Sequence, residues 1–587
     1  MEMKNKKKKI TAELYSVKEP DSAHYEKFRE FLKDKYEEDI PLTWIYDESQ
    51  KNGFRLIVDS DIYNWNSEGF IRQLHDDLLK VGGNNAAEVI PLLRDAVSTW
   101  TPRAIAEETG AVLTVGDGIA TVSGLEDATY GEILLFESGI RGMVQDLKRD
   151  YVGCVLFGDD RDIYEGSPVK RTGRTAGVPV GNAFVGRVVD ALGSPIDGKG
   201  PIAADTYNPI ESPAPGIIDR QSVNTPLETG ILAIDSMFPI GRGQRELIIG
   251  DRETGKTAIA IDTILNQKNK NVICIYVAIG QKMSSVVQIS ETLKKNGAMS
   301  YTIIVCASAA DSAPMQYIAP YSGTAIGEYF MNKGKDVLIV YDDLSKHAVA
   351  YRTLSLLLER APGREAYPGD VFYLHSRLLE RSAHLSDVRG GGSMTALPIV
   401  ETKAGDISAY IPTNIISITD GQIFLESDLF FAGQRPAINI GISVSRVGGD
   451  AQTKAVKKAT GAIRLDLAQY REMEVFTQFS SDLDEVTKKQ LLYGKSLMEL
   501  LKQEQYHPLR QHEQVIILVA ALSHIMLNMS QEQMTRFKRS LTCYIENKSP
   551  ALCQKIDSQG VLTDEMKQEI IDLSKEFLNL QKAREHE

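Results

Sequence analysis

The chain is poor in cysteine and has no long apolar run, and each of these shortages argues against a class of protein. Its 587 residues include five cysteines, which are widely spaced and form no Cys-x-x-Cys pair. This argues against a disulfide framework and a zinc site, so we expect reduced, buried thiols. A membrane-spanning helix needs about 18 apolar residues. The longest apolar stretch, residues 515–527, contains Ser523 and His524, and it predicts a buried helix instead.

Acidic residues outnumber basic ones over the whole chain. The 66 Lys and Arg against 79 Asp and Glu give a formal net charge of −13, which argues against a nucleic-acid-binding protein. Charged residues make up 25% and apolar residues 43%, values that are ordinary for globular proteins. The lysines within residues 4–9 are followed by no apolar segment, so we expect a solvated tail and not a secretory signal.

The length predicts about three to four domains, and the composition sets residues 1–95 apart as an added module. Helical periodicity appears there at residues 23–36 and 70–79, and a strand pattern at 54–58. All three tryptophans of the chain lie in its first hundred residues: Trp44, Trp65 and Trp100.

Three further domains are expected after residue 95. Short β-rich runs over residues 96–175 indicate a small barrel or sandwich. Strands alternate with helix-length segments over residues 176–452, which predicts a mostly parallel sheet flanked by helices. Residues 453–587 have helical spacing, with helices expected at 454–470, 484–502 and 563–583.

The strongest chemical signal is GDRETGKT at residues 250–257, which fits the pattern G-x-x-x-x-G-K-[ST]. An apolar strand pattern precedes it and a helical one follows, so main-chain amides and the positive helix N-terminus can cradle phosphates. Lys256 would reach the β- and γ-phosphates, and Thr257 would hold Mg²⁺. The candidate nucleotide-binding residues here are Gly250, Asp251, Arg252, Glu253, Thr254, Gly255, Lys256 and Thr257.

Two other strand ends extend this candidate site. The apolar residues 337–341 run into Asp342, the expected acidic residue on the metal side. The strand expected at residues 272–279 is followed by Gln281. A glutamine can orient water but has no carboxylate that could take a proton. These residues alone therefore leave open whether the site hydrolyses nucleotide.

Several stretches resemble the alpha subunits of the rotary F-type ATP synthases. They are PIGRGQRELIIG at 239–250, YDDLSK at 341–346, PGREAYPGD at 362–370, ITDGQ at 418–422 and GISVSRVGG at 441–449. The resemblance implies a multidomain α+β chain with a small β-barrel, a RecA-like P-loop α/β domain and a C-terminal helical bundle. It also implies ATP, ADP and Mg²⁺ as ligands and an alternating hexamer with beta subunits.

The resemblance is to alpha and not to the catalytic beta subunits, in which a glutamate general base stands at the position of Gln281. It implies a non-catalytic, regulatory site. It also implies that Arg446 is an arginine finger, supplied in trans to the γ-phosphate on beta, where a guanidinium neutralises charge on the transferring phosphoryl group. Ser417 resembles its companion hydroxyl. The residues implied beside adenine are Arg435, Pro436, Gln503 and Gln505.

The chain departs from the alpha pattern at three positions. Glu253 replaces a glutamine, and its carboxylate should repel a triphosphate unless it is protonated, paired with Arg252 or turned away. Glu359 stands where an arginine is usual. Asp450 stands where a small neutral residue is usual, and we expect it to be able to pair with Arg446.

The first 95 residues faintly resemble the C-terminal part of the delta subunit of the same enzyme; the alternative is an unrelated surface domain or a disordered extension. The wider resemblance implies gamma, delta and b as partners beside beta, with residues 481–484 in the loop that contacts gamma. It implies a peripheral position on the cytoplasmic face of a bacterial membrane. Membrane contact and transport of hydrogen or sodium ions would belong to the rotor sector.

Two other functions are compatible with the sequence. One is a catalytic homohexameric P-loop motor of the secretion or helicase type, against which Gln281 and the acidic charge both argue. The other is a diverged paralogue that serves only as a binding scaffold.

Overall fold

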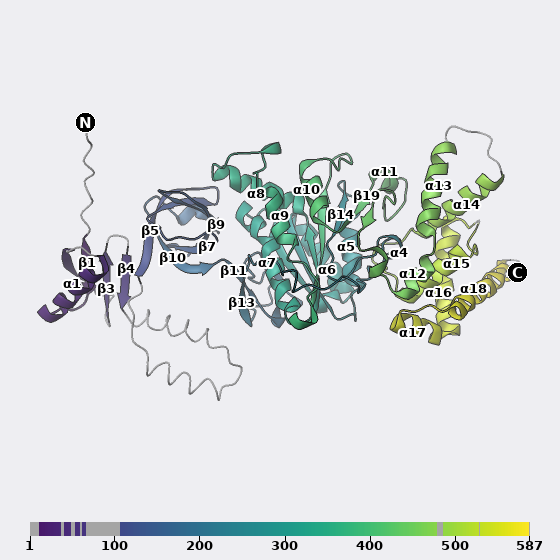
Figure 1. Cartoon of the computed structure of the whole chain (residues 1–587), viewed down its shortest axis with the longest axis horizontal. Coiled ribbons are helices and arrows are strands. Elements are labelled where there is room, and N and C mark those ends of the chain that lie inside the picture. The colour runs from purple at the N-terminus through teal and green to yellow at the C-terminus, as the bar shows by residue number, and fades with distance from the viewer. Residues whose placement is uncertain are drawn as a thin grey trace, which may run out of the picture. The chain divides into compact units, whose positions relative to one another are not determined.

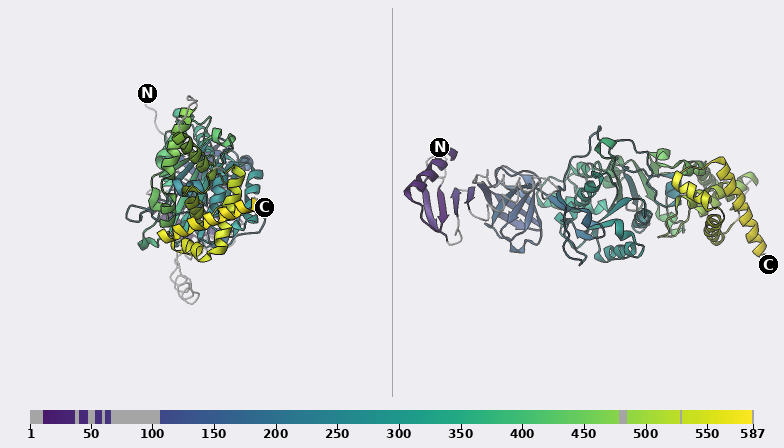
Figure 2. Two further views of the ribbon diagram at one scale, coloured as in Figure 1. Left: turned by 90° about the vertical axis from the view of Figure 1, so that its right-hand side faces the viewer. Right: turned by 90° about the horizontal axis from the view of Figure 1, so that it is seen from below.

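The chain divides into two compact units, Met1–Ala176 and Gly177–Glu587 (Figures 1 and 2). The computed structural model describes residues 11–36, 40–47, 53–58, 61–65, 106–477, 485–527 and 529–585. The helix predicted at residues 70–79, the residue Trp100 and the expected contact loop 481–484 lie outside these ranges.

The first unit begins with a four-stranded sheet packed against one helix. β1 (Ala12–Ser16), α1 (Ser22–Tyr36) and β2 (Leu42–Tyr46) form a parallel β-α-β unit, and β3 (Phe54–Val58) and β4 (Asp61–Trp65) form a hairpin beside β1. The helix predicted at 23–36 and the strand predicted at 54–58 are therefore confirmed. The small core of this N-terminal module consists of Ala12, Leu14, Leu32, Ile40, Leu56, Val58 and Tyr63.

The long strand β5 (Ala106–Gly116) connects this module to a closed six-stranded barrel. Its first residues pair with β4, and its later residues pair with β6 and β10. Because β10 returns to β5, the barrel closes without a free edge. The other barrel strands are β6 (Ile119–Ser123), β7 (Glu132–Phe136), β8 (Arg141–Leu147), β9 (Val152–Phe157) and β10 (Pro168–Thr175).

The second unit contains an eight-stranded sheet, parallel except for its last strand, with strand order β12-β16-β15-β17-β18-β14-β19-β20. Its central strands are buried on both faces, which explains their continuous apolar sequences. A separate pair, β11 (Gly177–Val180) and β13 (Thr206–Pro209), precedes it. The sheet strands are β12 (Val188–Asp190), β14 (Glu246–Gly250), β15 (Val272–Gln281), β16 (Thr302–Ser308), β17 (Asp336–Asp342), β18 (Ser393–Glu401), β19 (Gly421–Leu425) and β20 (Val444–Ser445).

Helices surround this sheet, as Figure 1 shows. Helices α5 to α8 all pack directly on its strands. The helices of this part are α4 (Leu232–Met237), α5 (Lys256–Leu265), α6 (Met283–Lys295), α7 (Ala313–Met331), α8 (Leu344–Leu357), α9 (Val371–Leu379), α10 (Tyr410–Ile418) and α11 (Ser427–Phe431).

The rest of the second unit is helical and shares one hydrophobic core with the sheet domain. The single helix predicted at residues 454–470 is wrong, because Gly461, with φ 52°, separates α12 from α13. The expected burial of all five thiols is also wrong, since Cys543 is exposed on the outer side of α16. The helices are α12 (Lys454–Thr460), α13 (Ile463–Thr477), α14 (Glu485–Leu500), α15 (Gln511–Leu522), α16 (Gln531–Lys548), α17 (Pro550–Gln559) and α18 (Asp564–Glu585).

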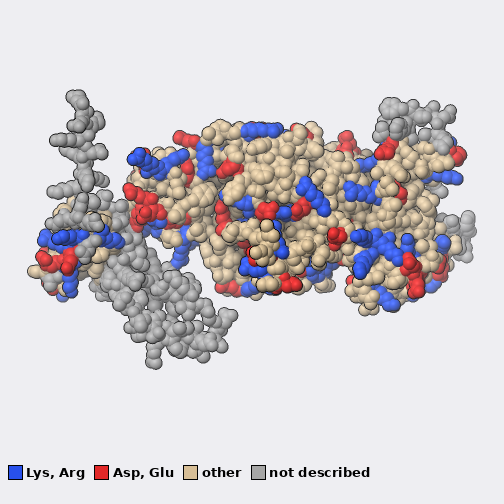
Figure 3. Space-filling model, in the orientation of Figure 1, with Lys and Arg blue, Asp and Glu red and all other residues tan. Residues whose placement is uncertain are grey.

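The described surface mixes charges of both signs. On the face shown in Figure 3, basic and acidic side chains are interspersed and do not form one basic stripe. Among the described residues, no helix is both long and apolar enough to cross a bilayer.

Candidate nucleotide-binding site

The P-loop, residues 250–257, leaves the carboxyl end of β14 and runs into α5. β14 lies between β18 and β19, so the loop stands at the carboxyl edge of the sheet, where open α/β sheets bind ligands. Gly255 has φ 98°, a left-handed conformation that favours glycine, and Lys256 begins the helix directly after it. The loop amides and the N-terminus of α5 therefore form an anion-binding cradle.

Lys256 is folded back over this loop. Its Nζ donates to the carbonyl oxygen of Gly250 at 2.9 Å and also to that of Asp251. Burial lowers the pKa of Lys256, while nearby carboxylates, Glu401 first among them, act in the opposite direction. The ammonium group thus lies within the cradle where the sequence predicts contact with phosphate.

Asp251 fixes the start of the loop to two neighbouring segments. Its carboxylate accepts hydrogen bonds from Thr402 Oγ1 at 2.6 Å, the Gly405 amide at 2.9 Å and Ser427 Oγ at 3.0 Å. Burial acts to raise the pKa of Asp251, but these hydrogen bonds outweigh it and hold the pKa below its usual range. Asp251 is therefore a brace for the loop, and sequence reasoning had placed it only among the ligand contacts.

The expected metal-side pair is brought together. Thr257 Oγ1 donates to Asp342 Oδ2 at 2.7 Å, across the gap between α5 and the end of β17. A hydroxyl and a carboxylate are oxygen ligands of the kind that Mg²⁺ prefers, so these two residues fit that ion. Tyr276 OH donates to the same oxygen at 2.6 Å. The sequence did not single out Tyr276, whose only signal was a tyrosine within an apolar strand.

Gln281, at the end of β15, contacts the main chain of Asp342 and the hydroxyl of Tyr276. Its amide nitrogen donates to the main-chain oxygen of Asp342 at 3.1 Å and to Tyr276 OH at 3.4 Å. An amide nitrogen can only donate hydrogen bonds. The arrangement thus gives Gln281 an orienting role within the site and no group that could accept a proton from water.

The two expected adenine-side glutamines are in different environments. The Gln503 amide donates to the carbonyl oxygens of Gly230 at 2.8 Å and His507 at 2.9 Å, and its oxygen accepts from the Leu232 amide at 3.0 Å. Both of its donor hydrogens are therefore used inside the protein. Gln505 is exposed.

The Arg435–Pro436 pair lies beside the segment that carries Gln503 and Gln505. The guanidinium of Arg435 stacks over the ring of Phe430, with 4.5 Å between its central carbon and the ring centroid. The carbonyl oxygen of Arg435 accepts from the main-chain amide of Gln503 at 2.9 Å. The structure thus joins the segment that carries Arg435 and Pro436 to the one that carries the two glutamines.

Glu253 is exposed to solvent and lies next to Arg252. It has φ 64°, its side chain is 88% exposed, and its Oε1 lies 3.9 Å from Nε of Arg252, which is 74% exposed. Pairing with Arg252, one of the ways in which its repulsion could be relieved, is therefore present. Solvent screens a charge in this position strongly.

Arg446 follows β20 and lies at the edge of the sheet opposite the P-loop. Ser445 stands opposite Gly421, which stands opposite Glu246 at the start of β14, whereas the P-loop follows the end of that strand. Four residues of strand separate the two levels by roughly 13 Å. Arg446 is therefore not arranged to serve the P-loop of its own chain.

The side chain of Arg446 is exposed, and within the described residues it makes no hydrogen bond or close ion pair. Burial raises the pKa of the nearby Glu246 carboxyl well above its usual range, and the charge of Arg446 acts in the opposite direction. The expected pairing with Asp450 is wrong, because the chain turns through a 3-10 segment, Gly448–Ala451, and leaves Asp450 exposed. The main-chain amide of Arg446 donates to the Asp420 oxygen at 2.9 Å. Ser417 is also exposed, and its hydroxyl donates to the Asn414 oxygen at 2.7 Å within α10.

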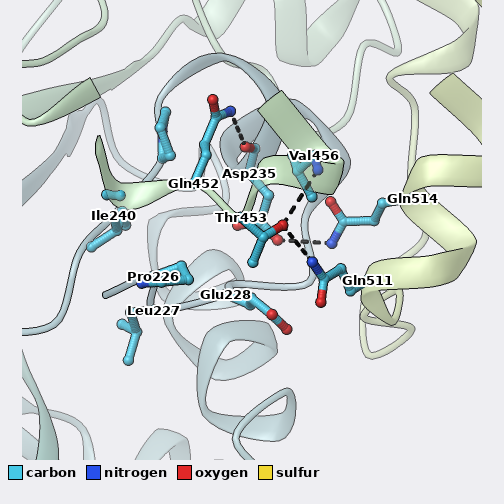
Figure 4. A pocket seen from close by; sticks show the side chains of 12 residues that line it. Pro226, Leu227, Glu228, Asp235, Ile240, Gln452, Thr453, Val456, Gln511 and Gln514 are labelled. Carbon is cyan, nitrogen blue, oxygen red and sulfur yellow. Dashed lines mark hydrogen bonds between the residues drawn. The ribbon is translucent and has the colours of Figure 1, made fainter. Parts of the chain in front are cut away.

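A small cavity of about 20 Å³ lies between the sheet domain and the helical domain, and no P-loop residue lines it (Figure 4). Asp235 lies at its wall. Burial raises the pKa of Asp235, and its carboxylate accepts from the Thr229 amide at 2.9 Å and from Gln514 of α15 at 2.8 Å. This contact joins the two domains and is separate from the nucleotide cradle.

Comparison with known proteins accounts for most of this architecture. Three family models match: "ATP synthase alpha/beta family, beta-barrel domain" at residues 105–173, "ATP synthase alpha/beta family, nucleotide-binding domain" at 230–445 and "ATP synthase alpha/beta chain, C terminal domain" at 452–577. The protein named ATP synthase subunit alpha from Clostridium botulinum (strain Alaska E43 / Type E3) is 59% identical over 495 residues, which cover 84% of this chain and 98% of that relative. The chain belongs to the family of ATP synthase alpha subunits.

A second relative supports the same conclusion. The ATP synthase subunit alpha of Clostridium botulinum (strain Eklund 17B / Type B) is likewise 59% identical over 495 residues, 84% of this chain and 98% of that relative. The chain is thus a nucleotide-binding alpha subunit of a rotary ATP synthase and a part of that enzyme complex. Membership in this family implies beta and gamma partners there. The first family-model match begins at residue 105, so the N-terminal module lies outside all three.

Proposed function

We propose that this alpha subunit is non-catalytic and regulatory: it binds Mg-ATP or Mg-ADP in its own site and supplies Arg446 to the catalytic site of a neighbouring beta subunit in an alternating hexamer. The observation that carries this proposal is the placement of Arg446. An exposed guanidinium that makes no hydrogen bond or close ion pair among the described residues, on the sheet edge opposite its own P-loop, suits a nucleotide that another chain holds.

The chain's own site supports binding without turnover. Gln281 is engaged as a donor to Asp342 and Tyr276, and it has no carboxylate that could serve as a general base. The phosphates would contact Lys256 and the loop amides, and Thr257 and Asp342 would hold Mg²⁺. When bound, Mg²⁺ neutralises negative charge on the phosphate oxygens.

At the adenine end we assign direct contact to Arg435, Pro436 and Gln505, and an indirect role to Gln503. The hydrogen bonds of Gln503 to Gly230, His507 and Leu232 fix the loop that carries Gln505. In the neighbouring catalytic site, Ser417 would stand beside Arg446 as a second group near the phosphate.

We assign the N-terminal module to the peripheral stalk, as a delta-like element that contacts delta or b subunits. Its parallel β-α-β unit followed by a hairpin is a small folded sheet domain with a core of its own, which argues against a disordered extension. The assembled enzyme would lie on the cytoplasmic face of a bacterial membrane, with gamma as its rotating partner. The membrane rotor would carry the hydrogen or sodium ions.

Reconstitution tests the proposal. The purified full-length chain should bind ATP with Mg²⁺ but hydrolyse it at no more than the rate of a buffer control, and hydrolysis should appear when a beta subunit is added. Brisk turnover by the chain alone would contradict a non-catalytic role and would favour a homohexameric motor. Mass measurement of the assembly should find equal numbers of the two chains.

A further inference from the structure

The carboxylate of Asp342 has a second hydroxyl donor that the nucleotide motifs do not account for. Tyr276 is fully buried in β15, and its hydroxyl donates to Asp342 Oδ2 at 2.6 Å. Thr257 Oγ1 donates to that same oxygen at 2.7 Å. Two donors therefore act on one oxygen, whereas Oδ1 has no donor among the side chains and amides that the structure describes.

The sheet register explains how Tyr276 reaches this point. Ala278 stands opposite Asp342 on the neighbouring parallel strand, and Tyr276 lies two residues earlier on the same face. The phenol reaches the carboxylate along this face of the sheet. The tyrosine is thus built into the sheet beneath the site and does not approach it from a loop.

We propose that Tyr276 is a positioning residue for the metal side of this alpha subunit's own nucleotide site. By donating to Oδ2 it fixes the orientation of the Asp342 carboxylate, whose Oδ1 has no donor among the described residues and would be available to hold the metal. Residues that orient a metal-binding carboxylate from behind typically change metal affinity by about 10- to 100-fold when they are removed. This role rests on the proposed binding of Mg²⁺ with nucleotide.

Tyr276 also links Gln281 to the same carboxylate. The Gln281 amide lies within hydrogen-bond distance of both Tyr276 OH, at 3.4 Å, and the Asp342 main-chain oxygen, at 3.1 Å. Removal of the phenol oxygen therefore loosens two groups of the site at once, while the P-loop amides and Lys256 keep their own contacts. We expect the metal-dependent part of nucleotide binding to weaken and the metal-independent part to remain.

The chain supplies a matched control. Tyr341 is the residue before Asp342, it is equally buried, and its hydroxyl shares a hydrogen bond of 2.7 Å with Thr324. Tyr341→Phe thus deletes the same atom from a neighbouring strand without touching the Asp342 carboxylate. A purely structural role of a buried tyrosine hydroxyl predicts similar behaviour for both variants.

Mn²⁺ binding separates the two roles. The full-length wild type, Tyr276→Phe and Tyr341→Phe would be titrated with Mn²⁺ at saturating ADP, with free Mn²⁺ followed by electron paramagnetic resonance, and ADP binding would also be measured in EDTA. We expect Tyr276→Phe to raise the Mn²⁺ dissociation constant about 10- to 100-fold, with ADP affinity in EDTA within about twofold of wild type. Tyr341→Phe should leave both constants within about twofold.

Equal Mn²⁺ affinities for the two variants would overturn the positioning role and leave the proposed nucleotide function intact. A wild type that binds no Mn²⁺ with ADP would overturn the proposed function itself, and the positioning role with it. Loss of ADP binding in EDTA by Tyr276→Phe alone would also contradict the proposal, because it would mean that the phenol supports the P-loop and not the metal side.

Discussion

The two edges of the central sheet are built in opposite ways, although one strand, β14, reaches both. At its carboxyl end, Lys256, Thr257 and Asp342 are buried or half-buried and are joined to one another or to main-chain oxygens. At its amino end, next to the level of Glu246, the side chain of Arg446 is exposed and makes no hydrogen bond or close ion pair among the described residues. The side chains at the first edge are hydrogen-bonded within the chain, whereas the Arg446 side chain at the second edge makes no hydrogen bond among the described residues.

This difference matches the two roles proposed for the subunit, which are nucleotide binding at its own P-loop and the supply of Arg446 to a neighbouring beta subunit. A site that binds its ligand alone gains from donors and acceptors that are fixed in advance, because little has to reorganise on binding. The role proposed for Arg446 instead requires a side chain without hydrogen bonds in its own chain, and its main chain is held by the hydrogen bond from its amide to the Asp420 oxygen. The predictions below set the two edges against each other.

Arg446→Ala should have the largest effect. In the reconstituted complex we expect ATP turnover to fall by about 10³- to 10⁵-fold, since an arginine finger contributes that much by stabilising charge in the transition state. Nucleotide binding to this subunit's own P-loop, measured by equilibrium dialysis, should not change. Arg446→Lys, which keeps the charge but loses the planar fork, should give an intermediate rate. Full turnover in Arg446→Ala would break the comparison.

Lys256→Gln should affect the other edge. The lost charge-assisted contact to phosphate is worth about 1.5–3 kcal/mol, so we expect this subunit's dissociation constant for ATP to rise about 10- to 150-fold. Isothermal titration of the full chain measures it. Lys268→Gln, which removes an exposed cation beyond the other end of α5, is the control and should change affinity by less than about threefold. A larger loss in the control would mean that the ligand lies outside the cradle.

Asp262 is a buried carboxylate on α5, the helix that follows the P-loop. It should make the stability of the fold depend on pH. Burial raises its pKa to about 6, and its carboxylate accepts from the Tyr506 amide at 2.7 Å. The folded state therefore holds a proton that the unfolded chain releases near pH 4. Stability should fall as the pH rises from about 4 to about 6 and then level off, by up to about 3 kcal/mol for this group. Asp262→Asn, compared with wild type by urea unfolding at pH 4.5 and 7, should remove that component; an unchanged difference between the two pH values would contradict the assignment.

Glu253→Gln should have the smallest effect. Because the carboxylate is 88% exposed and turned toward solvent, we expect ATP affinity to rise by less than about threefold, and the gain to vanish at high salt. A gain of tenfold or more at physiological salt would show that Glu253 faces the phosphates in the bound state.

Much of the nucleotide site could be predicted because its signals are local. The P-loop pattern and an acidic residue at the end of an apolar strand were enough to predict that Thr257 and Asp342 lie close together, as the structure shows. Tyr276 could not be found in this way, because a tyrosine in an apolar strand has the same pattern whether its hydroxyl meets a carboxylate or, as with Tyr341, a threonine. The hydrogen-bond partner of such a tyrosine depends on which strands are neighbours in the sheet, and the sequence of a single strand does not reveal that order.

Two of the wrong predictions share a related cause. Gly461 lies within a helical pattern, and one glycine lowers helix stability by only about 1 kcal/mol relative to alanine. Periodicity alone therefore predicts one helix where the structure has α12 and α13. Asp450 lies four residues after Arg446, a spacing that brings side chains together on a helix. The turn at Gly448–Ala451 is not an α-helix, and the two side chains stay apart. Spacing predicted contacts correctly only where the expected secondary structure formed.

The pairing of β4 with β5 has a consequence for anyone who shortens this chain to the length of its relatives. Ala106, Glu107 and Glu108 pair with Tyr63, Ile62 and Asp61, so a chain that begins at the barrel loses the ladder along the first part of β5. Its uncovered amides and carbonyls would form a strand edge that can recruit other chains. A trimmed subunit is therefore a candidate for self-association through backbone pairing, even if its barrel and nucleotide domain remain intact.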